Sequence, residues 1–196
     1  VLKNICGLWL VQECRRVWNE SGRLWSWDDL NRLSAAAAPR AALIDPDAPD
    51  FLNPPNMPEA ICEFCRRTGQ NPPGDEGAVL RCALDSLALK FRHVLAMCER
   101  LAGRRIETVH IVGGGTQNRQ LCQAAADACG RRVLAGGPIE ATATGNVMMQ
   151  AVAAGDVASI AEAREVIRES FEMIEYVPRD TAAWDEAYER FQRLIG

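Results

Sequence analysis

The sequence predicts an α/β domain in which a largely helical first half precedes a small sheet flanked by helices. Residues 107–112 and 131–135 are short apolar runs rich in β-branched residues, and a helical pattern follows each of them. Before residue 103, apolar residues recur at helical spacing between capping and turn signals. Two central strands are few for 196 residues, so we expect further strands at 1–5 and 171–177, or a chain that is part of a longer one.

The composition is that of a soluble globular protein, with 48% hydrophobic and 24% charged residues. A formal net charge of -4 gives no reason to expect a nucleic acid or an anionic membrane as partner. No apolar run approaches the roughly 20 residues of a membrane span, and no signal peptide opens the chain. We therefore expect a cytoplasmic protein that binds neither nucleic acid nor membrane.

The eight cysteines are too sparse for a disulfide-stapled secreted scaffold, and most lie on helical patterns, so we expect reduced thiols. Cys62 and Cys65 form a CxxC pair, but no second pair or close histidines complete a zinc site. The pair also lies inside a helical pattern, whereas a redox CxxC opens a helix after a strand. We therefore assign the chain no metal site.

Residues 107–122 carry the strongest functional signal, because a predicted strand passes through the glycines at 113–115 into a helix near Gln117. Glycines let backbone N–H groups at a helix start approach a phosphate, although an ordinary strand-to-helix turn would use the same residues. No Gly-Lys-Ser/Thr follows, which excludes a Walker A loop. Asn118 stands where a dinucleotide fingerprint has its third glycine. The phosphate interpretation therefore needs support from elsewhere in the chain.

The first predicted helix, at residues 6–18, carries a polar residue on its apolar face. Ile5, Leu8 and Trp9 share that face at helical spacing, and Gln12 falls on it as well. Such a glutamine lies either at the edge of a buried stripe or opposite a ligand. The spacing alone leaves both interpretations open.

Further helices are expected at 26–39, 59–68 and 78–102, with Ser26 and Asp75 as caps. The longest of these keeps an apolar stripe over its whole length, and His93 lies off the centre of that stripe without an assigned role. The proline-rich residues between the second and third helices should form an ordered surface excursion, anchored by Ile44, Phe51, Leu52 and Met57.

Residues 140–154 form a predicted helix of small residues with Gly145 in its middle, which costs about 1 kcal/mol relative to alanine. We expect close packing of a neighbouring helix to compensate for this cost, in preference to a bound group. Ser159 should cap the next helix, and residues 181–195 form a terminal amphipathic helix.

The chain shares several stretches with a known family: Leu2–Gln12, His110–Asn118 and Gly137–Asn146, supported by residues 43–54 and 84–89. By these stretches it resembles the carboxy-terminal part of the FGGY family of carbohydrate kinases, and within that family the rhamnulokinase branch. The glycine motif indicates the wider family, whereas the first stretch is typical of the branch. The resemblance covers essentially the whole chain, which we interpret as one nucleotide-binding carboxy-terminal domain at 1–196.

The resemblance implies an actin-like ATPase (ribonuclease H-like) fold in two domains, with nucleotide in the cleft between them. The family transfers the γ-phosphoryl group of ATP, with Mg²⁺, to a sugar hydroxyl, and in this branch converts L-rhamnulose to its 1-phosphate. By the match, Gly114 would lie against the nucleotide, Gly113 would shape the turn, and Asn118 would lie beside the adenosine. Asn4 and Gln12 match positions that hold the nucleotide in the branch.

The resemblance also implies that part of the enzyme is absent from this sequence. The family's sugar pocket, its catalytic aspartate and its first phosphate loop lie in an amino-terminal domain, and the first strands of the carboxy-terminal sheet also precede this chain. Asp45, Asp47 and Asp127 have no claim to the catalytic role, so we assign no catalytic residue. We expect the chain alone to be inactive and to self-associate through an unpaired sheet edge.

Two other hypotheses remain open. A dinucleotide-binding oxidoreductase half would use the glycine segment, but no acidic residue ends the strand at 131–135 to hold a ribose. A non-catalytic packing or oligomerisation domain would bind no nucleotide. Binding of ADP, of NAD or of neither distinguishes the three hypotheses.

Overall fold

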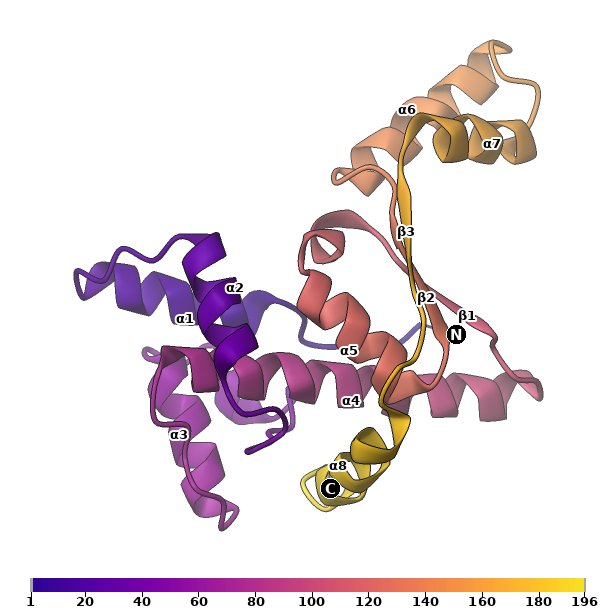
Figure 1. Cartoon of the computed structure of the whole chain (residues 1–196). Helices are drawn as coiled ribbons and strands as arrows, with labels where there is room; N and C mark the ends of the chain where they lie inside the picture. The colour runs from indigo at the N-terminus through magenta and orange to yellow at the C-terminus, as the bar shows by residue number, and fades with distance from the viewer. Residues whose placement is uncertain (1, 196) are drawn as a thin grey trace.

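The computed structural model describes residues 2–195, and its helices gather around one long helix with a small sheet beside it (Figure 1). The helices are α1 (Trp9–Glu20), α2 (Trp27–Ala36), α3 (Met57–Arg67), α4 (Glu76–Ala102), α5 (Arg119–Cys129), α6 (Ala141–Ala154), α7 (Ile160–Ser170) and α8 (Thr181–Gln192). The strands are β1 (Thr108–Ile111), β2 (Arg132–Gly136) and β3 (Met173–Tyr176), which confirms the predicted α/β class. Within the described residues no helix has the length and apolarity needed to span a membrane.

Side-chain caps fix several helix starts where the sequence predicted them. Ser26, Asp75 and Ser159 each accept the backbone N–H three residues later, at 3.1, 2.8 and 3.2 Å. Gly103 ends α4 in the left-handed region, with φ at 63°. The start of α1 differs, because Leu8 stands in the cap position and makes no side-chain cap bond.

The helical body consists of α1 to α5, α8 and the excursion between α2 and α3, with α4 at its centre (Figure 1). Leu80, Leu84 and Leu87 of α4 are buried, as the stripe predicted. Leu101 is 67% exposed, so the stripe does not continue to the end, because the last turns of α4 extend past α5 and α8. Helix α2 packs directly on the α4 backbone, since a Cβ at Gly77 would lie 2.6 Å from a backbone oxygen of α2.

The excursion between α2 and α3 is ordered, and it is anchored as predicted at all but one position. Ile44, Phe51 and Met57 are at most 1% exposed, but Leu52 is 82% exposed and the prediction of Leu52 as an anchor is wrong. The cause is the 3-10 turn at Pro49–Phe51, in which neighbouring side chains point in different directions, so that one faces inward and the next outward.

The sheet has the order β1-β2-β3, with β1 and β2 parallel and β2 and β3 antiparallel. Val133 and Ala135 of β2 are buried against α5, and Val133 lies opposite Tyr176 of β3. The strand predicted near residues 171–177 is therefore confirmed. The strand predicted at 1–5 is wrong for residues 2–5, which have no regular structure, and Val1 lies outside the described residues.

Helices α6 and α7 form an arm, which contacts the sheet end but lies away from the helical body (Figure 1). The two helices contact each other, yet α6 has no buried residue and Ala163 is the one buried residue of α7. A Cβ at Gly145 would meet nothing within 4 Å. The expectation that a neighbouring helix packs closely on Gly145 is therefore wrong for this structure.

All eight cysteines are free thiols, as the sequence predicted. Cys122 and Cys129 of α5 are buried. Burial raises the pKa of Cys122 to about 11 and that of Cys129 to about 12, so both thiols are neutral at physiological pH.

Candidate functional site

A cleft of about 540 Å³ lies between the starts of α1 and α2, the glycine segment after β1, and the middle of α4. Its lining combines apolar side chains, polar side chains and bare backbone, which is the combination expected of a small-molecule site. The lining residues are Gly7, Leu8, Val11, Gln12, Trp27, Asp28, Asn31, Phe91, Ile111, Gly114, Gly115, Gln117, Asn118 and Leu121.

The glycine segment turns the chain sharply after β1. Gly113 has φ at 72°, a left-handed conformation that favours glycine, and it opens a 3-10 helix over Gly113–Gln117. Gly113 therefore shapes the turn through its own backbone geometry. The helix predicted from Gln117 begins two residues later, at Arg119, because Asn118 caps it by accepting the N–H of Leu121 at 2.9 Å.

Gly114 exposes its backbone to the cleft. A Cβ at this position would meet nothing within 4 Å, so a side chain there would project into open space and not into protein. At Gly115 a Cβ would touch the Cγ2 of Ile111 at 3.4 Å, which is an ordinary contact. The thiol of Cys122 supports the segment from behind by donating to the carbonyl oxygen of Gly115, at 3.7 Å. The segment is thus held from the protein side and bare on the cleft side.

Gln12 lies in the cleft wall, but it is not on the apolar face of α1, where its spacing had placed it. The buried face of α1 is formed by Leu10, Val11, Cys14 and Trp18, whereas Gln12 is exposed. The predicted stripe of Ile5, Leu8 and Trp9 is therefore wrong. The reason is that α1 begins only at Trp9, so Ile5 is not on the helix and the apolar face is rotated.

The structure brings together three of the five residues expected to hold a ligand, namely Gln12, Gly114 and Asn118. Asn4 is exposed in the irregular segment before α1 and is not among the lining residues. Gly113 adjoins the cleft through its neighbour Gly114 and is not itself a lining residue. In the described residues, the cap uses Oδ1 of Asn118, and Nδ2 of the same side chain makes no hydrogen bond. This amide group remains available to a ligand.

Sequence reasoning missed part of the cleft wall, namely Trp27, Asp28 and Asn31 on α2 and Phe91 on α4. Trp27 is 41% exposed, and the guanidinium carbon of Arg15 lies 4.5 Å from the centre of its ring. The position of Trp27 directly after the Ser26 cap could have indicated that its ring is exposed. No such indication exists in the sequence for Phe91, because its place in the apolar stripe of α4 is typical of a core residue.

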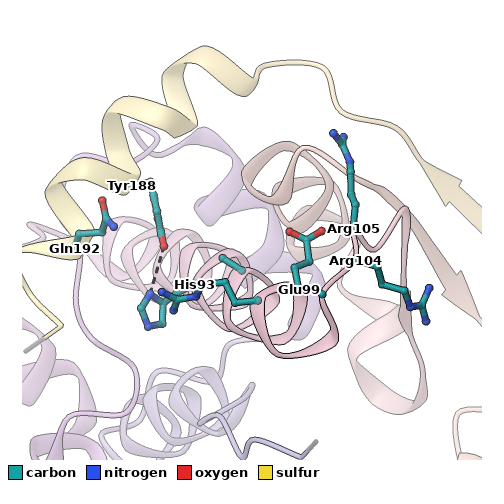
Figure 2. A pocket seen from close by; sticks show the side chains of 9 residues that line it. His93, Glu99, Arg104, Arg105, Tyr188 and Gln192 are labelled. Atoms are coloured by element: carbon teal, nitrogen blue, oxygen red, sulfur yellow. Dashed lines mark hydrogen bonds between the residues drawn. The ribbon is translucent and has the colours of Figure 1, made fainter.

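A second hollow, of about 680 Å³, lies between the last turns of α4 and α8 (Figure 2). His93 Nδ1 and the hydroxyl of Tyr188 approach to 3.3 Å across it, and burial lowers the pKa of His93. Arg104 and Arg105 also line it, but Figure 2 shows both side chains directed away from the His93–Tyr188 pair. The hollow contains none of the expected site residues, and its charged groups do not converge on one point.

Asp28 is the one carboxylate among the residues that line the cleft. In the part of the chain that the structure describes, no three His, Cys, Asp or Glu side chains gather closely enough to hold a metal ion. Mg²⁺ is usually held by one or two carboxylates together with waters and substrate phosphates. Asp28 could supply one such carboxylate, the other ligands would come from outside these residues, and no step of the chemistry is assigned to a metal on this chain.

The sequence of this chain matches a known protein family and several curated proteins. Residues 1–154 match the carboxy-terminal domain of the FGGY family of carbohydrate kinases. A rhamnulokinase from Bacteroides thetaiotaomicron is 44% identical over 195 residues, which is 100% of this chain and 39% of that protein. A rhamnulokinase from Pectobacterium carotovorum is 43% identical and covers 99% of this chain and 38% of its own length. The chain thus spans about two fifths of the length of these curated relatives.

Solved structures show the same fold. The xylulose kinase from Rhodospirillum rubrum aligns with a TM-score of 0.65 and 21% identity, over 95% of this chain and 36% of that chain. The Plasmodium falciparum glycerol kinase with ADP aligns with a TM-score of 0.59 and 13% identity, over 90% of this chain and 36% of that chain. At these identities the likeness concerns the fold, which is that of the actin-like ATPases.

Proposed function

Because the chain belongs to the FGGY family of carbohydrate kinases, we propose that it is the nucleotide-binding part of an ATP-dependent sugar kinase of the rhamnulokinase type. The complete enzyme would transfer the γ-phosphoryl group of ATP to L-rhamnulose and release ADP and L-rhamnulose 1-phosphate. The domain would extend over residues 1–196, beyond the 154 residues that the family match covers. We also propose a cytoplasmic location, where ATP is available.

The observation that carries the proposal is the convergence of Gln12, Gly114 and Asn118 on one cleft. Gly114 and Asn118 are neighbours in the segment between β1 and α5, whereas Gln12 comes from α1, far earlier in the chain, so the fold and not local spacing brings Gln12 to them. The family resemblance indicates the same three residues by sequence alone, without regard to their positions in space. Their common cavity therefore supports a nucleotide site more strongly than the glycines alone.

The cleft offers different surfaces to the two ends of a nucleotide. Leu8, Trp27 and Phe91 give it an apolar wall that suits the flat face of a purine. On the opposite side, the bare backbone at Gly114 allows a ribose or phosphate group to approach closely, and the amide of Asn118 can donate to it. Asn4 and Gly113 would act from outside the cleft wall, Asn4 through the irregular segment before α1 and Gly113 through the turn.

Asp45, Asp47 and Asp127 lie where none of them could activate a sugar bound at the cleft. Asp45 pairs with Lys90 at 2.7 Å, and Asp127 accepts the N–H of Arg179 at 2.7 Å. Neither of them, nor Asp47, lines the cleft. Phosphoryl transfer requires a carboxylate that orients the attacking hydroxyl and a clamp on the γ-phosphate. We therefore propose that the sugar site and the catalytic carboxylate belong to an amino-terminal domain, and that Mg²⁺ enters with ATP.

The first prediction concerns Gly114→Val. Since a side chain here projects into open space, valine should fill the cleft and weaken ADP binding by at least tenfold without lowering the melting temperature. ADP titration of the ¹⁵N-labelled chain by NMR measures weak binding residue by residue. Gly74→Val is the matched control, because a Cβ at Gly74 also meets nothing within 4 Å and the residue lies outside the cleft.

Three results would contradict the proposal. Normal ADP affinity in the Gly114→Val variant would show that the nucleotide does not contact this segment. NAD binding in place of ADP by the unchanged chain would favour a dinucleotide enzyme, and binding of neither would favour a packing or oligomerisation domain.

A further inference from the structure

A charged cluster lies on the core side of the segment that leads into α1. The amine of Lys90 on α4 lies 2.7 Å from Asp45 Oδ1 and 3.1 Å from Asp47 Oδ2, and the Lys90 side chain is only 8% exposed. Although burial alone would favour the neutral amine, the hydrogen bonds to Asp45 and Asp47 raise the pKa of Lys90. Asp45 Oδ1 also accepts the backbone N–H of Asp47 at 3.1 Å. The cluster therefore fixes the Asp45–Asp47 turn on α4.

Asp47 reaches from this cluster to the amino-terminal segment. Its Oδ1 accepts the backbone N–H of Cys6 at 2.8 Å, across 41 positions of sequence. Within residues 2–7 as described, this is the one backbone hydrogen bond, since no strand pairing and no turn bond involves the segment. The amine of Lys3 lies 4.0 Å from Asp47 Oδ2 and adds a weak, exposed ion pair.

The residues that follow Cys6 form one wall of the cleft. Gly7 and Leu8 line it directly, and Gln12 lies one helical turn further along α1. Leu8 has no side-chain cap bond and the first turn of α1 contains no acidic residue, so the helix start is not fixed by its own sequence. The hydrogen bond that Cys6 makes, two residues before Leu8, is the nearest contact through which the rest of the fold can set where α1 begins.

We propose that Asp47 is a positioning residue for the nucleotide cleft: it holds Cys6 and thereby places the start of α1 in the cleft wall. The inference rests on the proposed nucleotide site and adds a residue that does not itself touch the cleft. Lys90 supports the same arrangement, because it anchors Asp47 and directly precedes Phe91, which also lines the cleft. One short stretch of α4 therefore holds both Phe91 and, through Asp47, the segment before α1.

Asp47→Ala tests the inference. It removes the acceptor for the Cys6 N–H and should weaken ADP binding by roughly tenfold or more, since hydrogen bonds to charged groups are among the stronger ones. Amide hydrogen exchange at Cys6 should become faster. Asp47→Asn keeps an acceptor of the same shape and should retain most of the affinity, which a loss of stability alone would not explain.

Asp50→Ala is the matched control. Asp50 lies in the same excursion and pairs with Arg67 at 2.7 Å, but it contacts neither the amino-terminal segment nor the cleft, so ADP affinity should not change. Cys6→Pro is a second test variant, which replaces Asp47→Ala if that variant does not fold. It removes the backbone N–H that donates to Asp47 and leaves the buried charges in place. Unchanged ADP affinity in either folded variant overturns the inference while the nucleotide site stands. Failure of the unchanged chain to bind ADP would overturn both proposals together.

Discussion

The helical body and the arm are built from equally regular helices, yet they differ in what covers them. In α4 of the body, Leu80, Leu84 and Leu87 are buried against α2, α5 and their neighbours. In the arm, Val147 and Met149 of α6 are 62% and 50% exposed, and Ala163 is the one buried residue of α7. Apolar side chains on both surfaces have the same affinity for a partner, but only those of the body have found one within this chain.

The difference indicates how the two regions are stabilised. The body buries enough apolar surface in its own core to define one packing, and the candidate cleft is lined by the body, β1 and the glycine segment, with no residue of the arm. The arm and the open edge of β1 present apolar surface and unpaired backbone groups beyond that core. We therefore expect the body, together with β1 and the glycine segment, to fold and bind nucleotide without the arm, and the arm to require a further protein surface.

The largest expected effect is on catalysis. The chain alone should phosphorylate no L-rhamnulose, because the general base, which contributes roughly 10²–10⁴ in rate, and the acceptor site would both lie outside the chain. The assay is sugar-dependent ADP release, with the chain alone and with the amino-terminal part of the Bacteroides thetaiotaomicron relative added. Product in the mixture only would support the proposal that this chain holds the nucleotide and an amino-terminal domain holds the sugar and the general base. Turnover by the chain alone would mean that the catalytic carboxylate has been misplaced.

One side-chain substitution by alanine in each region tests whether the body is better packed than the arm. Leu84→Ala should lower the free energy of unfolding by about 2–5 kcal/mol, since it leaves a cavity in the body. Val147→Ala in the arm should change it by less than about 0.5 kcal/mol. Leu101→Ala is the matched control, because the same residue type at the exposed end of α4 should behave like the arm. Urea unfolding measures all three, and a large loss at Val147 would show that the arm is part of the core.

Self-association should map to the arm and the sheet edge. Sedimentation should show concentration-dependent oligomers of the chain, and Met149→Lys should reduce them by placing a charge in the apolar surface of α6. Leu52→Lys is the control, since Leu52 is 82% exposed on the body. A chain that stays monomeric at high concentration would contradict the expectation that the arm needs a partner.

The sequence predicted helix caps and the glycine turn correctly, but it predicted the wrong buried face for α1. The caps at Ser26 and Asp75 and the turn at Gly113 follow from backbone chemistry within a few residues, so a single sequence contains them. The predicted buried face of α1 was wrong because Leu8 gives no sign of where the helix begins, and Asp47, which holds Cys6 just before the helix, lies far along the chain.

The same limit applies to the candidate site. Gln12, Gly114 and Asn118 could be proposed from the family resemblance, and the structure places them in one cleft. Trp27 and Phe91 reach the cleft only because α2 and α4 pack beside α1 and the glycine segment, and contacts between distant elements leave no pattern in one sequence.

Two glycine-to-alanine substitutions should change stability in opposite directions, one in the arm and one in the body. Gly145→Ala should stabilise α6 by about 1 kcal/mol, because alanine restricts the unfolded chain and its methyl group meets nothing within 4 Å. Gly77→Ala should destabilise the body by about 1–3 kcal/mol, since its Cβ would lie 2.6 Å from the carbonyl oxygen of Leu33 and force α2 away from α4. Hydrogen exchange of the α6 amides should slow by roughly fivefold in the first variant, and urea unfolding measures the second. A stability loss at Gly145 in the chain alone would show that the arm already packs on a surface of this chain, and the contrast between the two regions would then fail.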